Sequence, residues 1–228
     1  MGPFFRQLSH AAAAAARDAY VKQGGLVVLN DFFAPAFVES LADSVRAAGL
    51  PKARVRIPGV RSAASTGAQS IRRALPSLRA FYESPALISF LSNLVGRELG
   101  VCPDWDDHAH PLYYYEEPGD FIAPHKDKSF YRGGRFTALV GLVDESTSEL
   151  VCRHAGPAGP REARVRTTPG SLVLFDGDRI LHSVSPLGKG ECRIVLSLQY
   201  VDDARISVLG KFIHGWKDRL IYFRNTGR

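Results

Sequence analysis

The sequence predicts an α+β protein with a mainly β core and supporting helices toward the N-terminus. Apolar residues with helical spacing dominate the first hundred positions. After residue 100, short β-branched and aromatic runs alternate with Gly, Pro and Asp, a pattern typical of a barrel or sandwich. With 228 residues, 45% hydrophobic and 23% charged, the chain is long enough for one buried core, and disorder is excluded.

Three helices are expected in the first hundred residues. Ser9 can cap a helix that ends near Lys22, where two glycines follow. The segment 34–48 repeats apolar residues every four positions, which predicts one buried helical face. Ser84 and Pro85 supply a cap and a proline at the first helical position of the third helix.

The strands are expected mostly after residue 100. One short apolar strand is predicted earlier, at 26–29, whereas 51–73 shows no clear period and is predicted to be a loop or an ordered lid. The later strands are expected at 112–115, 136–143, 164–166, 171–175 and 193–201. The predicted layout is a single domain over 1–228, with mostly helical support in 1–100, a β core in 101–205 and a closing segment in 206–228.

Charge and cysteine content narrow the function classes. No run approaches the roughly 18 apolar residues of a membrane-spanning helix, and the alanine run near the N-terminus is a predicted helix. The three cysteines are odd in number and lack CxxC spacing, which argues against a disulfide framework or a structural zinc site and favours a reducing cytoplasm. The net charge of +6 fits nucleic acid, headgroups or small acidic ligands.

Four residues carry the predicted chemistry. His125 and Asp127 form an H-x-D pair in FIAPHKDKSF, and His182 follows the apolar run LVLFDGDRIL. Two imidazoles and one carboxylate are the ligand set that binds Fe(II) and leaves coordination positions open. Arg193 stands alone in the apolar strand CRIVLSLQY, where burial requires an anionic partner such as a ligand carboxylate.

This ordered set resembles the Fe(II)/2-oxoglutarate-dependent dioxygenases, which share an H-x-D…H…R pattern. The resemblance covers roughly residues 110–201 and implies a double-stranded β-helix, the jelly-roll or cupin-like fold. It also implies three cofactors and cosubstrates, namely Fe(II), 2-oxoglutarate and O2. His125, Asp127 and His182 are the implied metal ligands and catalytic residues.

The same resemblance implies how 2-oxoglutarate is held. Arg193 pairs with the C5 carboxylate, and Tyr113 or Tyr115 supplies a hydroxyl, because alternation puts both tyrosines on one face of a strand. Two positions depart from relatives: Val195 replaces a frequent serine, which removes one cosubstrate contact, and Gln199 replaces the second arginine of nucleic-acid demethylases. The carboxylate of Asp127 favours hydroxylation, desaturation or ring formation over halogenation.

The expected enzyme is a hydroxylase that oxidises an unactivated C–H of a small molecule, a free amino acid or natural-product intermediate that carries a carboxylate. The alternatives are a peptidyl hydroxylase of the prolyl type, or a non-catalytic β-barrel that binds a ligand or nucleic acid. We expect neither a nucleic-acid partner nor a membrane, and the oligomeric state is open. Candidate substrate contacts are Arg72, Arg73, His108 and Trp216.

Overall fold

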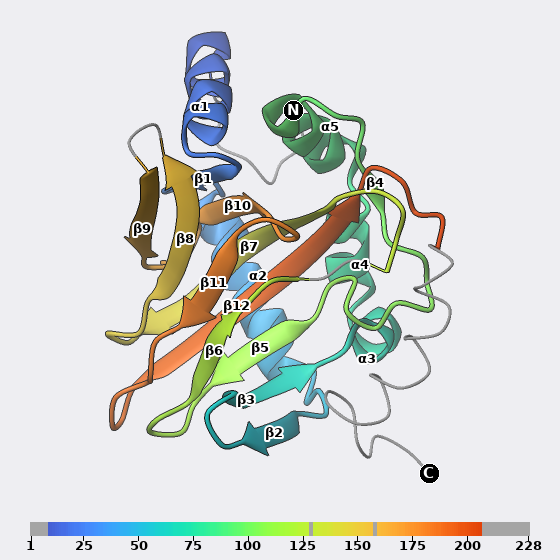
Figure 1. Ribbon diagram of the computed structural model, residues 1–228. Helices are drawn as coiled ribbons and strands as arrows, with labels where there is room; N and C mark the ends of the chain where they lie inside the picture. Colours follow the sequence, from blue (N-terminus) through green and yellow to red (C-terminus); the bar gives the residue numbers. More distant parts are fainter. Residues whose placement is uncertain (1–8, 128–129, 157–158, 207–228) are drawn as a thin grey trace.

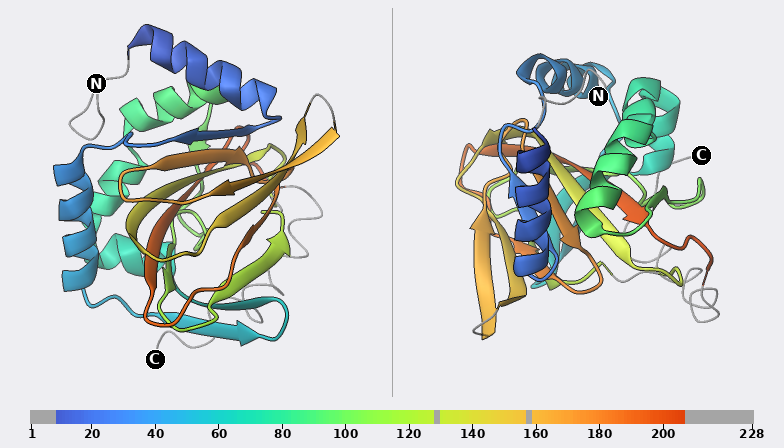
Figure 2. Two further views of the ribbon diagram at one scale, coloured as in Figure 1. Left: turned by 90° about the vertical axis from the view of Figure 1, so that its left-hand side faces the viewer. Right: turned by 90° about the horizontal axis from the view of Figure 1, so that it is seen from above.

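The computed structural model describes residues 9–127, 130–156 and 159–206. This part of the chain forms an antiparallel sheet that curls into a nearly closed barrel, with helices packed outside it (Figures 1 and 2). The predicted α+β class with a mainly β, jelly-roll core is confirmed. The described helices are α1 (His10–Lys22), α2 (Pro35–Ala47), α3 (Ala68–Ala74), α4 (Pro76–Tyr82) and α5 (Pro85–Val95).

The sheet contains twelve of the described strands. Along its main path the order is β1-β10-β7-β12-β5-β3-β6-β11-β8-β9, and β2 and β4 pair with β3 and β12 at its margins. The strands are β1 (Leu26–Leu29), β2 (Ala53–Ile57), β3 (Arg61–Thr66), β4 (Gly100–Val101), β5 (Leu112–Tyr115), β6 (Phe121–His125), β7 (Arg135–Glu145), β8 (Leu150–Gly156), β9 (Gly159–Val165), β10 (Leu172–Asp176), β11 (Leu181–Val184) and β12 (Cys192–Val201).

The helix boundaries follow the local signals in the sequence. The Ser9 side chain accepts a hydrogen bond from the backbone N–H of Ala12 at 3.2 Å, which caps α1 as predicted. Pro85 occupies the first turn of α5, and Gly96 ends it in the left-handed conformation with φ of 75°. The two starts form where the sequence predicts them because capping depends on neighbours in the chain, whereas α5 ends earlier than the predicted end near residues 99–100.

The prediction of a loop over 51–73 was wrong. β2 and β3 form an antiparallel hairpin there, and β3 continues into the sheet between β5 and β6. Three strands therefore lie within the first hundred residues, which were expected to be mostly helical apart from 26–29. The missing signal is tertiary, because the basic residues of this segment are paired with the acidic turn that follows β5. These pairs are Lys52 with Glu116, Arg54 with Glu117 and Asp120, and Arg56 with Glu117.

The strands β7 and β12 separate two cores. Along β12, Ile194, Leu196 and Leu198 pack in the cluster that also contains helix residues, whereas Val195 belongs to the smaller cluster inside the barrel. This alternation follows from the two-residue period of a strand. Because both faces of β12 are covered and both edges are paired, polar side chains on its inner face are enclosed.

No helix among the described residues is long and apolar enough to cross a bilayer. The three cysteines are free, and Cys102 and Cys152 are buried. The predicted closing segment, including Trp216, lies outside the described residues apart from Ile206.

Candidate metal centre

His125, Asp127 and His182 come together at one end of the barrel. His125 is the last residue of β6, His182 lies opposite it on the antiparallel neighbour β11, and Asp127 follows β6 by two residues. One ligand atom from each residue lies within 4.8 Å of the other two. Among the described residues this is the one such group of His, Cys, Asp or Glu, so the predicted triad is assembled.

The donor atoms converge on one point. The Oδ1 atom of Asp127 lies 3.6 Å from Nε2 of His125 and 3.6 Å from Nε2 of His182. The Nδ1 atoms face backbone carbonyls, at 3.0 Å for Ala123 and 3.2 Å for Ile180. A neutral imidazole that donates from Nδ1 has its lone pair on Nε2, so both rings are held as the tautomer that can bind a metal.

The three triad residues change one another's pKa values. Burial alone would raise the pKa of Asp127, but His182, His125 and the Thr137 hydroxyl lower it well below its usual range. Burial lowers the pKa of His182, whereas at His125 the bond and charge of Asp127 outweigh burial and raise the pKa. The carboxylate is therefore anionic, as a hard cation requires.

The backbone of Asp127 is fixed by the turn after β10. Its N–H donates to the carbonyl of Gly177 at 2.9 Å. A Cβ atom at Gly177 would lie 2.9 Å from Cβ of Asp127 and 3.0 Å from Oγ1 of Thr137. Glycine is needed there so that this turn can approach the carboxylate residue closely.

Arg193 lies deeper in the barrel and is 1% exposed. Its Nε and Nη2 atoms donate to Oγ1 of Thr167 at 3.0 and 2.8 Å, and Nη1 donates to Oγ of Ser148 at 3.4 Å. Asp144, which lies opposite Arg193 on β7, is paired with Arg166. Among the described residues no carboxylate forms an ion pair with Arg193, so an enclosed cation has only neutral partners.

One cavity connects the triad with Arg193. Tyr113 and Tyr115 both line it, as alternation predicts, and Arg193 Cζ lies 5.3 Å from the centre of the Tyr115 ring. Val195 lines the wall and offers no polar group there. The apolar wall is completed by Ile122, Leu139, Leu150, Phe175 and Val184.

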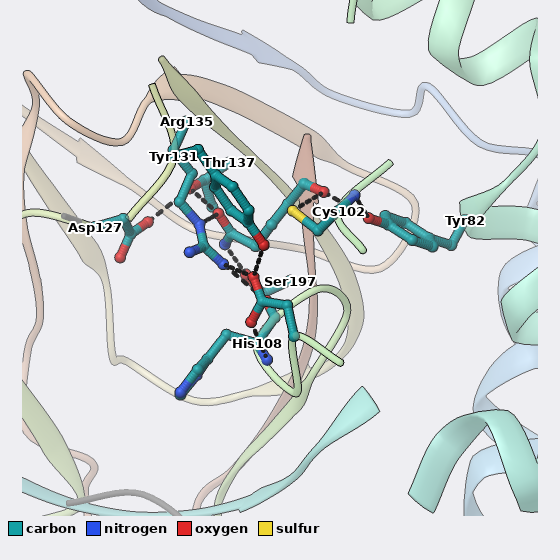
Figure 3. Close-up of polar contacts among 10 residues, drawn as sticks. Tyr82, Cys102, His108, Asp127, Tyr131, Arg135, Thr137 and Ser197 are labelled. Carbon is teal, nitrogen blue, oxygen red and sulfur yellow. Dashed lines mark hydrogen bonds and ion pairs between the residues drawn. The ribbon is translucent and has the colours of Figure 1, made fainter. Parts of the chain in front are cut away.

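Of the predicted substrate contacts, Arg72, Arg73 and His108 do not line this cavity. Arg72 on α3 is bound to the backbone carbonyl and the carboxylate of Asp104, and Arg73 is exposed. His108 lies in the loop before β5, and its ring points away from the polar groups around Arg135 (Figure 3). Trp216 is outside the described residues. Their role toward a substrate stays a prediction.

Several polar residues of the site were missed by sequence reasoning. Thr137 and Arg135 project inward from β7, and Ser197 and Gln199 project inward from β12. The alternation in RFTAL and RIVLSLQ would have found them, because each lies two or four residues from another inward-facing residue. Thr167 and Ser148 lie in connecting segments and give no such signal.

The solved structures that match this architecture include α-ketoglutarate-dependent enzymes. The epimerase SnoN from nogalamycin biosynthesis, described as α-ketoglutarate dependent, matches with a TM-score of 0.68 and 19% identity over 85% of this chain and 84% of SnoN. The fold is that of the 2-oxoglutarate oxygenases. A Pseudomonas putida prolyl-4-hydroxylase matches with a TM-score of 0.57 and 20% identity, over 84% of this chain and 98% of its own.

A third match extends the fold similarity. A 2OG-Fe(II) oxygenase family protein from Burkholderia pseudomallei matches with a TM-score of 0.63 and 14% identity, over 91% of this chain and 98% of its own. No family model matches the sequence, and a search of curated proteins returns no match. The likeness therefore shows a shared fold, and the activity has to be argued from the site.

Proposed function

We propose that this protein is an Fe(II)- and 2-oxoglutarate-dependent oxygenase. The observation that carries the proposal is the single cavity that joins a two-histidine, one-carboxylate cluster to an enclosed arginine without an anionic partner among the described residues. The first is the donor set of non-haem Fe(II) oxygenases, and the second fits the far carboxylate of a dicarboxylic acid.

Different residues would bind the metal and the cosubstrate. His125, Asp127 and His182 would hold the metal through Nε2, Oδ1 and Nε2, and Arg193 would bind the C5 carboxylate of 2-oxoglutarate, with the Tyr115 ring beside its guanidinium. When bound, the iron and its cosubstrate supply the activation of O2 that oxidises a C–H bond and releases succinate and CO2. Apolar walls exclude water from this chemistry.

The proposed substrate is a small molecule that carries a carboxylate, and the proposed outcome is hydroxylation of an unactivated C–H. The small-molecule part of this proposal is supported by the epimerase SnoN, whose structure with Fe3+, α-ketoglutarate and nogalamycin RO matches with a TM-score of 0.66. His108 stays the proposed substrate contact on the loop before β5, and Arg72, Arg73 and Trp216 stay proposals for the same role. A single oxygenase domain over 1–228, in a reducing cytoplasm, completes the proposal.

A prolyl-type peptidyl hydroxylase is the second candidate. It is favoured by the match to the Pseudomonas putida prolyl-4-hydroxylase. A prolyl hydroxylase in complex with a hypoxia inducible factor peptide fragment, from Trichoplax adhaerens, also matches with a TM-score of 0.62. The two candidates share the metal chemistry and differ in what approaches it.

Anaerobic addition of Fe(II) and 2-oxoglutarate tests the reaction class. We expect a weak visible charge-transfer band in the wild type that is lost in His125→Ala and Asp127→Ala, with Arg164→Met on β9 as an exposed control. A wild type without the band would reject the oxygenase. A salt-sensitive mobility shift with DNA or RNA in such a protein would instead support the binding-protein alternative.

Succinate release separates the substrate classes. The wild type is presented with O2, 2-oxoglutarate and, in turn, free amino acids, carboxylated natural-product intermediates and proline-containing peptides. We expect substrate-stimulated succinate in the small-molecule arms. Stimulation by peptides alone would replace the first candidate with the peptidyl hydroxylase.

A further inference from the structure

The two carboxylate oxygens of Asp127 have different surroundings. Oδ1 faces the two imidazoles, whereas Oδ2 accepts a hydrogen bond from the Thr137 hydroxyl at 2.6 Å. Thr137 is 2% exposed and lies on β7 beside the candidate metal centre. A short bond from a buried hydroxyl to a carboxylate is charge-assisted and fixes the rotation of the carboxylate plane.

The Thr137 hydroxyl has one proton and two acceptors within reach. Its Oγ1 also lies 2.9 Å from Oε1 of Gln199. That amide oxygen already accepts from Nε of Arg135 at 3.0 Å, and the amide Nε2 donates to Oγ of Ser197 at 2.9 Å, so the amide orientation is determined. The carboxylate is the anionic and closer acceptor, and the proton is therefore directed at Asp127.

The same chain of contacts continues to the loop before β5 (Figure 3). Nη2 of Arg135 lies 3.3 Å from Oδ2 of Asp106 and 3.3 Å from the carbonyl oxygen of His108. Asp106 also accepts from the Tyr131 hydroxyl at 2.7 Å and from the backbone N–H of His108 at 2.9 Å. Asp106, Arg135 and Gln199 are each at most 6% exposed, so water does not compete for these bonds.

We propose that Thr137 is a positioning residue that makes Asp127 present one oxygen to the metal. The proposal rests on the proposed function. One-oxygen binding matters there because a carboxylate that bound through both oxygens would occupy a position needed by the cosubstrate or O2.

Co(II) binding tests the role of Thr137 without turnover. Anaerobic titration is followed by the visible d–d bands in wild type, Thr137→Val and Thr137→Ser. We expect Thr137→Val to bind Co(II) 10- to 100-fold more weakly, the usual cost of losing the partner of a metal ligand, and to change the band intensity as the coordination changes. Thr137→Ser, which keeps the hydroxyl, is expected to stay within about threefold of wild type.

Thr66→Val is the matched control. Thr66 is 1% exposed and its hydroxyl donates to the carbonyl of Pro51 at 2.8 Å, so the same atoms are removed from an equally buried site away from the metal centre. We expect its Co(II) affinity and spectrum to match wild type even where its melting temperature falls.

The outcomes separate the two proposals. Co(II) binding by Thr137→Val within twofold of wild type, with an unchanged spectrum, would overturn the positioning role and leave the metal centre intact. An equal loss in Thr66→Val would also overturn it, because the effect would then come from weakened packing. A wild type that binds no Co(II) would overturn the metal centre together with this inference.

Discussion

Two buried arginines on paired strands of the same barrel have opposite surroundings. Arg135 on β7 is 5% exposed and contacts Asp106, Gln199 and the carbonyl of His108. Arg193 on β12 is 1% exposed and has hydroxyl groups and an aromatic ring as its partners. Burial lowers the pKa of both. At Arg135, Asp106 together with Cys102, Asp127 and Tyr131 outweighs burial and raises the pKa, whereas the pKa of Arg193 is lowered.

The difference distinguishes a structural charge from a binding charge. A guanidinium stays protonated at any ordinary pH, so an enclosed arginine needs an anion from the protein or from a ligand. Arg135 has the protein anion and belongs to the scaffold of the metal centre. Arg193 lacks one among the described residues, which is why we assign it to the cosubstrate. This assignment can be tested by removing each charge in turn.

Removal of the Arg135 charge is expected to have the largest effect. Arg135→Met leaves the carboxylate of Asp106 buried without its cation, and we expect the free energy of unfolding to fall by about 3–5 kcal/mol. Urea denaturation followed by circular dichroism measures it. A loss below about 1 kcal/mol would show that Arg135 is not a structural charge and would end the contrast.

Arg193→Met is expected to weaken cosubstrate binding strongly while leaving the stability of the protein almost unchanged. Stability should change by less than about 1 kcal/mol or increase, because no protein carboxylate is left behind. Binding of 2-oxoglutarate to the Co(II) protein, measured by anaerobic calorimetry, should weaken at least 100-fold, about 2.7 kcal/mol. Arg164→Met, a change at a solvent-exposed ion pair, serves as the control. Affinity within threefold of wild type would assign the far carboxylate to another group.

His110 sharpens the contrast, because it is a buried basic group that can lose its charge. It is fully buried, neither ring nitrogen has a hydrogen-bond partner among the described residues, and burial lowers its pKa to about 3. In the unfolded chain His110 binds a proton near pH 6.5, whereas in the folded protein it stays neutral. Folding is therefore not penalised by His110 above pH 6.5, and the free energy of unfolding decreases as the pH falls from 6.5 toward 3.

The variant His110→Phe removes the titrating group and keeps an aromatic ring beside Tyr82, whose ring centre lies 4.5 Å from that of His110 in the wild type. Relative to wild type, we expect it to gain about 2 kcal/mol in unfolding free energy between pH 7 and pH 5, at about 1.4 kcal/mol for each pH unit below 6.5. Urea denaturation at both pH values measures the difference, with the exposed His10→Gln as control. Equal pH dependence in wild type and variant would contradict the neutral state of His110.

Thr167→Val gives the smallest expected effect. It removes the hydroxyl that accepts from Nε and Nη2 of Arg193, so the guanidinium is less well oriented while its charge is kept. We expect 2-oxoglutarate binding to the Co(II) protein to weaken about tenfold, roughly 1.4 kcal/mol, and Co(II) affinity to stay unchanged. An effect as large as that of Arg193→Met would mean that orientation, more than charge, decides binding.

Local sequence patterns predicted much of the fold. The strands at 26–29 and 112–115 occupy the predicted positions, as do the starts of α1 and α5. The hairpin of β2 and β3 was missed because its charged residues look like a solvated loop until the acidic turn after β5 is brought against them. β11 is no shorter than the strands at 26–29 and 112–115, but its residues Leu-His-Ser-Val form no apolar or aromatic run.

The sequence predicted the candidate site in part as well. His125, Asp127, His182 and Arg193 were predicted by residue type and order, and the structure brings them to one cavity. The hydroxyl groups of Thr137, Ser197, Thr167 and Ser148 were not predicted, and Gln199 was noted only as a departure from nucleic-acid demethylases. A threonine or glutamine in a strand is common, and only its neighbour across the sheet gives it a role.

The sequence by itself predicted which residues carry the proposed chemistry, three of the five described helices and about half of the described strands. These depend on residue type, capping and period, which act over a few positions. Only the tertiary structure decided which buried charge has a partner. Arg135 meets Asp106 across 29 positions and Gln199 across 64, and such pairings follow from strand order and register. That pairing separates Arg135, a scaffold charge, from Arg193, the proposed binding charge.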